Sequence, residues 1–168
     1  MSDLIDVLEI LKSQHDEVDE LFERIEAGRG DRAALFAQLA DKLAAHAAVE
    51  EKIFYPSVMS ERTNDQLHES VEEHLAMKRL IADLIALDPD DDEQTFDAKL
   101  SVLKEEVTHH ARQEEEGKLF PIVRRMFDAQ ERAALGNEVL ALFEQLIARE
   151  PRRKVPSETA KAAPLPSL

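Results

Sequence analysis

The chain has 168 residues and contains no cysteine. Its length is that of one ordinary domain, which can bury a core without disulfides or a structural metal. The lack of cysteine excludes disulfide scaffolds, thiolate zinc sites, iron–sulfur clusters and cysteine nucleophiles. Any bound metal must therefore use nitrogen and oxygen ligands. With 36 acidic and 21 basic residues, the formal net charge is −15, which disfavours binding to nucleic acid or to an anionic membrane surface.

Two further features of the composition concern fold class and localisation. The chain has 4 Gly and 7 Pro, where average usage predicts about 20 of the two together, and this scarcity of turn residues predicts an all-α protein. No apolar run approaches the ~18 residues of a membrane span. Met1–Ile10 carries Asp3, Asp6 and Glu9 where a secretory signal has positive charge and then an apolar stretch. We therefore expect a cytoplasmic protein that binds neither nucleic acid nor membrane.

Four amphipathic segments follow one another along the chain, and each has inward-facing residues at steps of three and four. The first segment ends at Gly28 and Gly30, and Asp31 is placed to cap the second. Pro56 ends the second segment, and the acidic loop around Pro89 ends the third. The seams, in chain order, are Leu4, Leu8, Leu11, His15, Val18, Phe22 and Ile25; Phe36, Leu39, Leu43, His46, Glu50 and Ile53; Leu67, Val71, His74, Met77, Ile81 and Leu84; and Phe96, Leu100, Leu103, Val107, His110 and Glu114.

Long amphipathic helices joined by short loops predict an antiparallel up-down four-helix bundle over residues 1–128. A seam histidine precedes a His-x-x-x-Glu pair in each half, and each half ends in an aromatic–proline pair, so the bundle should have a pseudo-twofold repeat. An additional C-terminal helix is expected over residues 129–150. Residues 151–168 are rich in Pro, Ala and Ser without periodicity, which predicts a disordered tail. Docking of this tail on a protein partner is the weaker alternative.

Polar residues recur at one level of the predicted core. A single histidine on an apolar stripe is usually a hydrogen-bonded core residue. Here, however, each of the four helices carries one, and two of them are followed one turn later by a carboxylate. Burial of so many ionisable groups is costly unless something pairs them, and metal ions are the simplest partners. The predicted ligands are His15, His46, Glu50, His74, His110 and Glu114.

The remaining two histidines serve as a control for this interpretation. His68 lies about 120° around its helix from His74, and His109 lies about 100° from His110, so neither should join the site. Glu106 and His109 form one Glu-x-x-His pair, whereas ferritin-like di-iron bundles use two, which argues against that family.

Four imidazoles and two carboxylates exceed the needs of one tetrahedral zinc and suit two first-row ions bridged by the carboxylates. Iron is the preferred metal for this donor set, and manganese or zinc are alternatives. Tyr55, the only tyrosine, follows Glu50 and is interpreted as a packing residue at a helix end, the alternative being a hydrogen bond near the site.

The arrangement of His15, His46-x-x-x-Glu50, His74 and His110-x-x-x-Glu114 resembles the hemerythrin-like HHE cation-binding family. The resemblance covers roughly residues 1–128. It implies a four-helix bundle, a non-haem di-iron centre, and reactions with oxygen, peroxide or nitric oxide, or a role in iron handling.

One position departs from the oxygen-carrying members of that family, which have an additional histidine four residues from the partner on the third helix. Ser70 and Lys78 occupy the positions four away from His74. Without that additional ligand, the two irons of the implied centre should have similar ligands and open coordination positions. This favours peroxide or oxygen reduction as the function. A non-catalytic iron, oxygen, nitric oxide or redox sensor is the alternative, and oxygen storage is third.

The identity of the second carboxylate depends on one extra residue in the second half. Pro56 lies six residues after Glu50, but Pro121 lies six after Glu115 and seven after Glu114. Such an insertion is commonly absorbed as a π-bulge. A bulge at Gly117 would make Glu114 the ligand, whereas one between His110 and Glu115 would make Glu115 the ligand. Since glycine eases an irregular turn, we predict Glu114.

Overall fold

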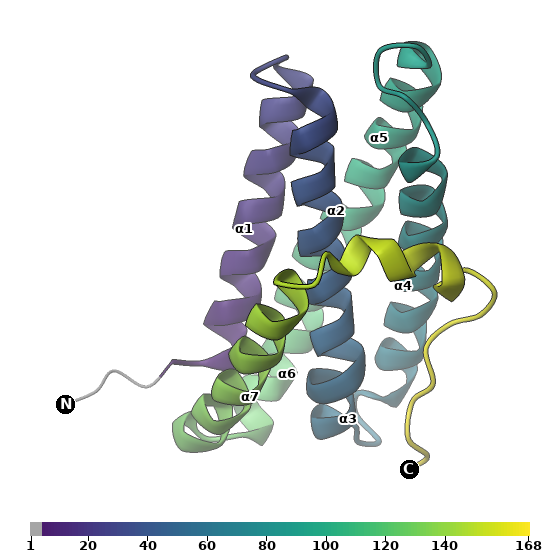
Figure 1. Cartoon of the computed structure of the whole chain (residues 1–168). Helices are drawn as coiled ribbons and strands as arrows, with labels where there is room; N and C mark the ends of the chain where they lie inside the picture. The colour runs from purple at the N-terminus through teal and green to yellow at the C-terminus, as the bar shows by residue number, and fades with distance from the viewer. Residues whose placement is uncertain (1–4) are drawn as a thin grey trace.

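The computed structural model describes residues 5–168, so the predicted seam residue Leu4 lies outside the described part. Within it the chain is helical and forms the predicted four-helix bundle (Figure 1). The first and third bundle helices are α1 (Val7–Glu26) and α4 (Asn64–Ile85). The second runs without a break through α2 (Arg32–Val49), η1 (Glu50–Phe54) and α3 (Tyr55–Val58). The fourth runs through α5 (Glu93–Thr108), η2 (His109–Leu119) and α6 (Phe120–Met126).

The helix ends follow from local sequence. The Asp6 carboxylate accepts a hydrogen bond from the Leu8 amide, and Asp31 accepts one from the Ala34 amide, as expected of N-cap residues. Gly28 and Gly30 have positive φ angles of 67° and 87°, which turn the chain between α1 and α2.

The segments η1 and η2 are π-helical, with wider turns than an α-helix. The segment η2 lies in the middle of the fourth bundle helix and η1 lies near the end of the second, and each begins at the level of the polar seam residues. The backbone irregularities therefore coincide with the site.

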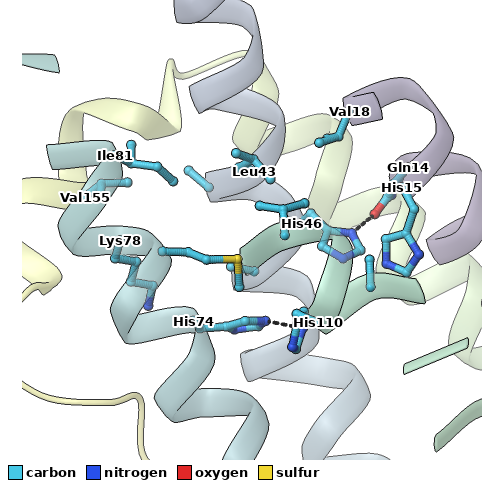
Figure 2. Close-up of a pocket in the computed structure, with 15 residues that line it drawn as sticks. Gln14, His15, Val18, Leu43, His46, His74, Lys78, Ile81, His110 and Val155 are labelled. Atoms are coloured by element: carbon cyan, nitrogen blue, oxygen red, sulfur yellow. Dashed lines mark hydrogen bonds between the residues drawn. The ribbon is translucent and has the colours of Figure 1, made fainter. Parts of the chain in front are cut away.

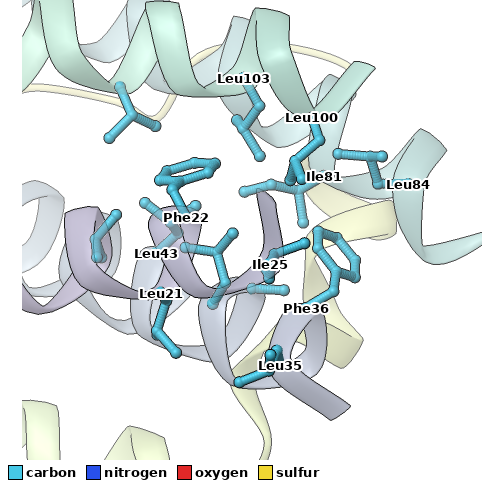
Figure 3. Packing of buried hydrophobic residues seen from close by; sticks show 14 of the residues in the cluster. Leu21, Phe22, Ile25, Leu35, Phe36, Leu43, Ile81, Leu84, Leu100 and Leu103 are labelled. Atoms are coloured by element: carbon cyan, nitrogen blue, oxygen red, sulfur yellow. The ribbon is translucent and has the colours of Figure 1, made fainter. Parts of the chain in front are cut away.

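Two apolar clusters form the core, with the polar layer between them. One cluster is built around Phe22, Phe36 and Phe96 in the half of the bundle that holds the α1–α2 loop (Figure 3). The other is built around Phe54 and Phe120 at the opposite end. Because apolar side chains fill the bundle on both sides, the polar layer is shielded from water along the bundle axis.

The predicted fifth helix is α7 (Ala129–Ile147), which packs on α1 and α2 and is capped by the reciprocal hydrogen bonds of Asp128 and Glu131. The helices approach so closely at Gly136 that a β-carbon there would lie 3.2 Å from the Val7 amide nitrogen and would overlap the Ile5 carbonyl oxygen.

The prediction of a disordered tail from residue 151 onward is wrong. Pro151–Glu158 forms a 3₁₀ helix, η3, that crosses α2 and α4 on the outside of the bundle (Figure 1). Val155 is buried in the first core cluster, and Ala162 and Leu165 pack against the second. Three isolated apolar residues anchor this segment, and they leave no periodic pattern in the sequence. None of the helices in residues 5–168 combines the length and apolarity needed to cross a membrane.

Candidate metal centre

Four histidines meet in the polar layer, one from each bundle helix, as the seams predict. His15 comes from α1, His46 from α2, His74 from α4 and His110 from the start of η2. All four are buried. Figure 2 shows them as two neighbouring pairs, His15 beside His46 and His74 beside His110. The other two histidines, His68 and His109, are exposed, so the periodicity separates the two groups correctly.

Two buried carboxylates complete the layer and divide it into two clusters. Glu115 joins His15 and His46, and Glu50 joins His74 and His110. In each cluster one donor atom per residue lies within 4.8 Å of the others, which is close enough to hold a metal ion. The two clusters are contiguous, since Glu115 Oε1 lies 3.2 Å from His15 Nε2 and 3.3 Å from His110 Nε2. Glu50 Oε1 lies 2.9 Å from His46 Nε2 and 3.4 Å from His74 Nε2.

The structure brings together five of the six predicted residues and replaces the sixth, Glu114, by Glu115. The Glu114 carboxylate belongs to neither cluster and accepts a hydrogen bond of 2.9 Å from Lys118. The π-helical turns of η2 begin at His109, so the extra residue is absorbed between His110 and Glu115. Placing the irregularity only at Gly117 was therefore wrong. A π-turn brings residues five apart onto one face, which is the spacing of His110 and Glu115.

Each histidine is held on its outer side by a residue that sequence reasoning did not identify. The Nδ1 atoms of His15 and His46 lie 2.7 Å from Glu116 Oε2 and 2.6 Å from Gln14 Oε1. Those of His74 and His110 each lie 2.9 Å from a carboxylate oxygen, of Glu51 and Glu73 respectively. Every one of these partners is adjacent in sequence to a residue of the two clusters. That adjacency was the available signal, since neighbours on a helix reach adjoining positions around the same layer.

This outer shell fixes the tautomers of the four rings. Carboxylate and amide oxygens accept hydrogen bonds, so each neutral imidazole donates from Nδ1 and turns the lone pair of Nε2 toward the clusters. The Nε2 atoms of His74 and His110 then face each other at 3.0 Å. At this distance their two lone pairs repel each other unless a cation lies between them.

Five buried atoms in the layer lack a hydrogen-bond partner: His15 Nε2, His46 Nε2, both carboxylate oxygens of Glu50, and Glu115 Oε1. Buried polar atoms are normally paired. All five are metal-donor atoms that point into the clusters, so the residues present fit a bound metal.

Without a metal, protons and carboxylates compensate one another. Burial lowers the pKa of His46, but the Glu50 and Glu115 carboxylates outweigh this effect and raise it to about 9. Burial and the neighbouring Glu115 raise the pKa of Glu50, but His46 and His110 prevail and bring it to about 2. The metal-free clusters therefore hold protons that a metal must displace.

Tyr55 belongs to the site, and its interpretation as a helix-end packing residue was incomplete. Its hydroxyl donates to Glu115 Oε2 at 3.1 Å and lies 3.3 Å from Nε2 of both His74 and His110. Burial, and then the two carboxylates, raise its pKa well above 10. Phe120 follows Glu115 by five residues, as Tyr55 follows Glu50, and its ring stacks on that of His15.

Comparisons with known proteins agree with this geometry. The family model described as the hemerythrin HHE cation binding domain matches residues 6–123. A curated protein of Nostoc sp. (strain PCC 7120 / SAG 25.82 / UTEX 2576), described as a DNA nickase, is 28% identical over 129 residues, which is 76% of this chain and 36% of that protein. The chain thus spans about a third of the length of this curated relative.

A solved structure has the same fold. The crystal structure of a hemerythrin HHE cation binding domain-containing protein from Mycobacterium kansasii, a Rv2633c homologue, matches 92% of this chain and 94% of its own, with a TM-score of 0.74 and 21% identity. A family match over most of the chain, together with the two His/Glu clusters, establishes the kind of protein this is. The chain belongs to the hemerythrin HHE cation-binding domain family.

Proposed function

We propose that the two clusters bind two iron ions and that the protein consumes hydrogen peroxide. One observation carries the metal assignment: four imidazoles, each tied at Nδ1 to an outer oxygen, present Nε2 to two buried carboxylates whose oxygens largely lack partners. The proposed ligands are His15, His46 and Glu115 for one ion, and Glu50, His74 and His110 for the other.

The donor set supports iron or manganese over a structural zinc, and we propose iron. Imidazole and carboxylate ligands without thiolate suit iron and manganese, whereas a structural zinc site is closed by four ligands. Two imidazoles and one carboxylate per ion leave positions open, and each carboxylate lies within 3.4 Å of ring nitrogens from both clusters. When bound, iron supplies the redox chemistry that no side chain of this layer provides.

The chain's own residues hold the rings, supply a proton and exclude water. The outer carboxylates of Glu51, Glu73 and Glu116 keep three of the imidazoles oriented. The Tyr55 hydroxyl stays protonated at rest because of its raised pKa, and its contacts with His74, His110 and Glu115 place it to relay a proton between neighbouring groups. Disproportionation needs such proton movement, because two molecules of hydrogen peroxide give one of dioxygen and two of water.

Neither position four residues from His74 on the third helix carries a histidine: they are Ser70 and Lys78, and Lys78 is engaged elsewhere. Lys78 Nζ lies 2.9 Å from Glu51 Oε1 and 3.2 Å from Glu158 Oε2. With no additional imidazole the two clusters have matching donor sets, which favours turnover at both over reversible oxygen carriage at one.

A small molecule is a better partner than a nucleic acid for this chain. The net charge of −15 opposes contact with phosphate backbones, and the clusters are buried inside the bundle. We therefore do not extend the nickase activity of the longer relative to this domain.

Metal analysis and peroxide consumption test the proposal together. Protein loaded anaerobically with ferrous iron and desalted should retain two irons per chain, and it should release dioxygen from peroxide at an oxygen electrode. His46→Ala and His110→Ala should lose iron, whereas the exposed His68→Ala should retain it. One tightly bound zinc with no iron uptake would refute the di-iron assignment. Manganese bound at both clusters would refute the choice of iron and leave a two-manganese centre in its place. Binding of two irons without peroxide consumption would favour a non-catalytic sensor as the function. Formation of a reversible oxygen complex would favour oxygen storage.

A further inference from the structure

An apolar cavity lies directly against the clusters, on the side of the first core cluster. Its volume is about 30 Å³, roughly twice the ~15 Å³ that one water molecule requires. The rings of His46, His74 and His110 form its floor, and Leu43, Met77 and Val155 are among its walls (Figure 2). A molecule in this cavity would touch the histidines that the proposed function places on the metals.

One wall of the cavity comes from outside the four-helix bundle. Val155 belongs to the C-terminal strap, which we define as residues 151–160, and it packs among core residues such as Leu43 and Ile81. Its side chain is 2% exposed, although the residues around it in η3 lie mostly on the surface. Val155 therefore separates the cavity from solvent at the place where the strap crosses α2 and α4.

Polar contacts at the surface fasten the strap at both ends. At the α2 end, the Arg152 guanidinium lies 2.7 Å from the Asp41 carboxylate, which also accepts from the Arg152 amide at 3.1 Å. At the α4 end, Arg79 donates to the carbonyl oxygens of Thr159 and Ala160 at 3.0 and 3.5 Å.

These fastenings are weak compared with the core of the bundle. Partly exposed ion pairs contribute little to stability and are screened by salt. A segment anchored by one apolar side chain and such pairs opens more readily than a packed helix does. The strap can therefore lift while the bundle and the clusters remain folded.

We propose that Val155 is the gate of the cavity and sets the size of the molecule that reaches the clusters. In the closed strap the cavity admits a molecule of two or three non-hydrogen atoms, such as hydrogen peroxide, and bulkier molecules must wait for the strap to open. The identity of the substrate rests on the proposed function, whereas the role of Val155 as the wall does not.

Xenon tests the wall without any reaction, because an apolar cavity binds this apolar atom. Full-length protein as purified is titrated with xenon, and binding is followed by NMR. Val155→Ala should raise xenon affinity at least about threefold because it enlarges the cavity, and Val155→Phe should abolish binding because it fills it. Val139→Ala is the matched control, since Val139 is equally buried but lies in the other core cluster. Equal xenon affinity in all four proteins would overturn the proposal.

The size preference is tested by comparing hydrogen peroxide with the bulkier tert-butyl hydroperoxide. Arg152→Ala weakens one end of the strap and leaves the cavity wall intact, so it should raise the relative rate for the bulky peroxide about fivefold with xenon affinity unchanged. Val155→Ala should raise the same ratio by about tenfold, since two buried methyl groups are lost. Unchanged ratios in both variants would refute the gate. If neither peroxide reacts with any variant, the proposed function fails, and the xenon series still decides the role of Val155.

Discussion

Glutamine substitutions at Glu115 and Glu114 distinguish the two candidate carboxylates of the second half. Glu115 is fully buried, and its Oε1 atom lies within 3.3 Å of Nε2 of His15 and His110. Glutamine preserves the volume but replaces an anionic oxygen by a neutral amide. Loss of an outer partner of a metal ligand costs about 10–100-fold in affinity, so loss of a direct donor should cost at least about 100-fold. We expect Glu115→Gln to lose one iron or both after loading and desalting.

The control, Glu114→Gln, should retain two irons. The Glu114 carboxylate pairs with the largely exposed Lys118, and such a solvent-screened pair contributes little to stability. Iron is measured by mass spectrometry against protein concentration, and circular dichroism checks that both variants are folded. Retention of iron by Glu115→Gln with loss by Glu114→Gln would refute the π-helical register on which the site rests. Equal losses would show that neither contact decides metal binding.

The other predictions concern pH, proton supply and packing. Metal-free protein should lose up to about 3 kcal/mol of stability as pH rises from 6.5 to about 9. In this range the folded state keeps the His46 proton and the unfolded state does not, so the advantage of the folded state disappears as His46 is deprotonated. It should also lose stability as pH falls from 4.5 toward about 2, because Glu50 becomes protonated. Metal-loaded protein should show the opposite trend above pH 5, becoming more stable with rising pH because protons compete with the metal. Thermal unfolding of both forms across this range checks the signs, and parallel curves would contradict the displacement of protons. Tyr55→Phe should retain both irons but slow peroxide consumption by about 10²-fold, the lower range for a positioned proton donor. An unchanged rate would remove the hydroxyl from the reaction. Gly136→Ala should destabilise the protein by about 1–2 kcal/mol, because overpacking against the Ile5 carbonyl outweighs the ~1 kcal/mol that alanine gains in a helix. Asn137→Ala, on the exposed side of the same helix, should not destabilise it, and an equally stable Gly136→Ala would show that α7 is not held closely against the N-terminal end of α1.

Regular helix geometry accounts for the parts of the site that sequence could predict. His15, His46, Glu50 and His74 lie on seams whose three- and four-residue steps persist up to the site, so counting along the chain placed them correctly. Counting failed at Glu115, because the π-helical turns of η2 shift the seam by one residue and the sequence does not specify where a bulge falls.

The outer partners and the strap depended on information that periodicity does not contain. Gln14, Glu51, Glu73 and Glu116 face neighbouring helices, and their contacts depend on how those helices are rotated against one another. The strap is held by the isolated side chain of Val155 and by contacts with surface residues far away in the chain, so its composition alone resembles a linker.

The aromatic residues that follow the two carboxylates make the pseudo-symmetric site directional. Tyr55 presents a hydroxyl to His74 and His110, whereas Phe120, at the equivalent position, presents only hydrocarbon to His15. A hydroxyl donor therefore lies beside His74 and His110, and no such donor lies at the equivalent place beside His15, so the two clusters differ in hydrogen-bond donors although their sets of imidazole and carboxylate donors match.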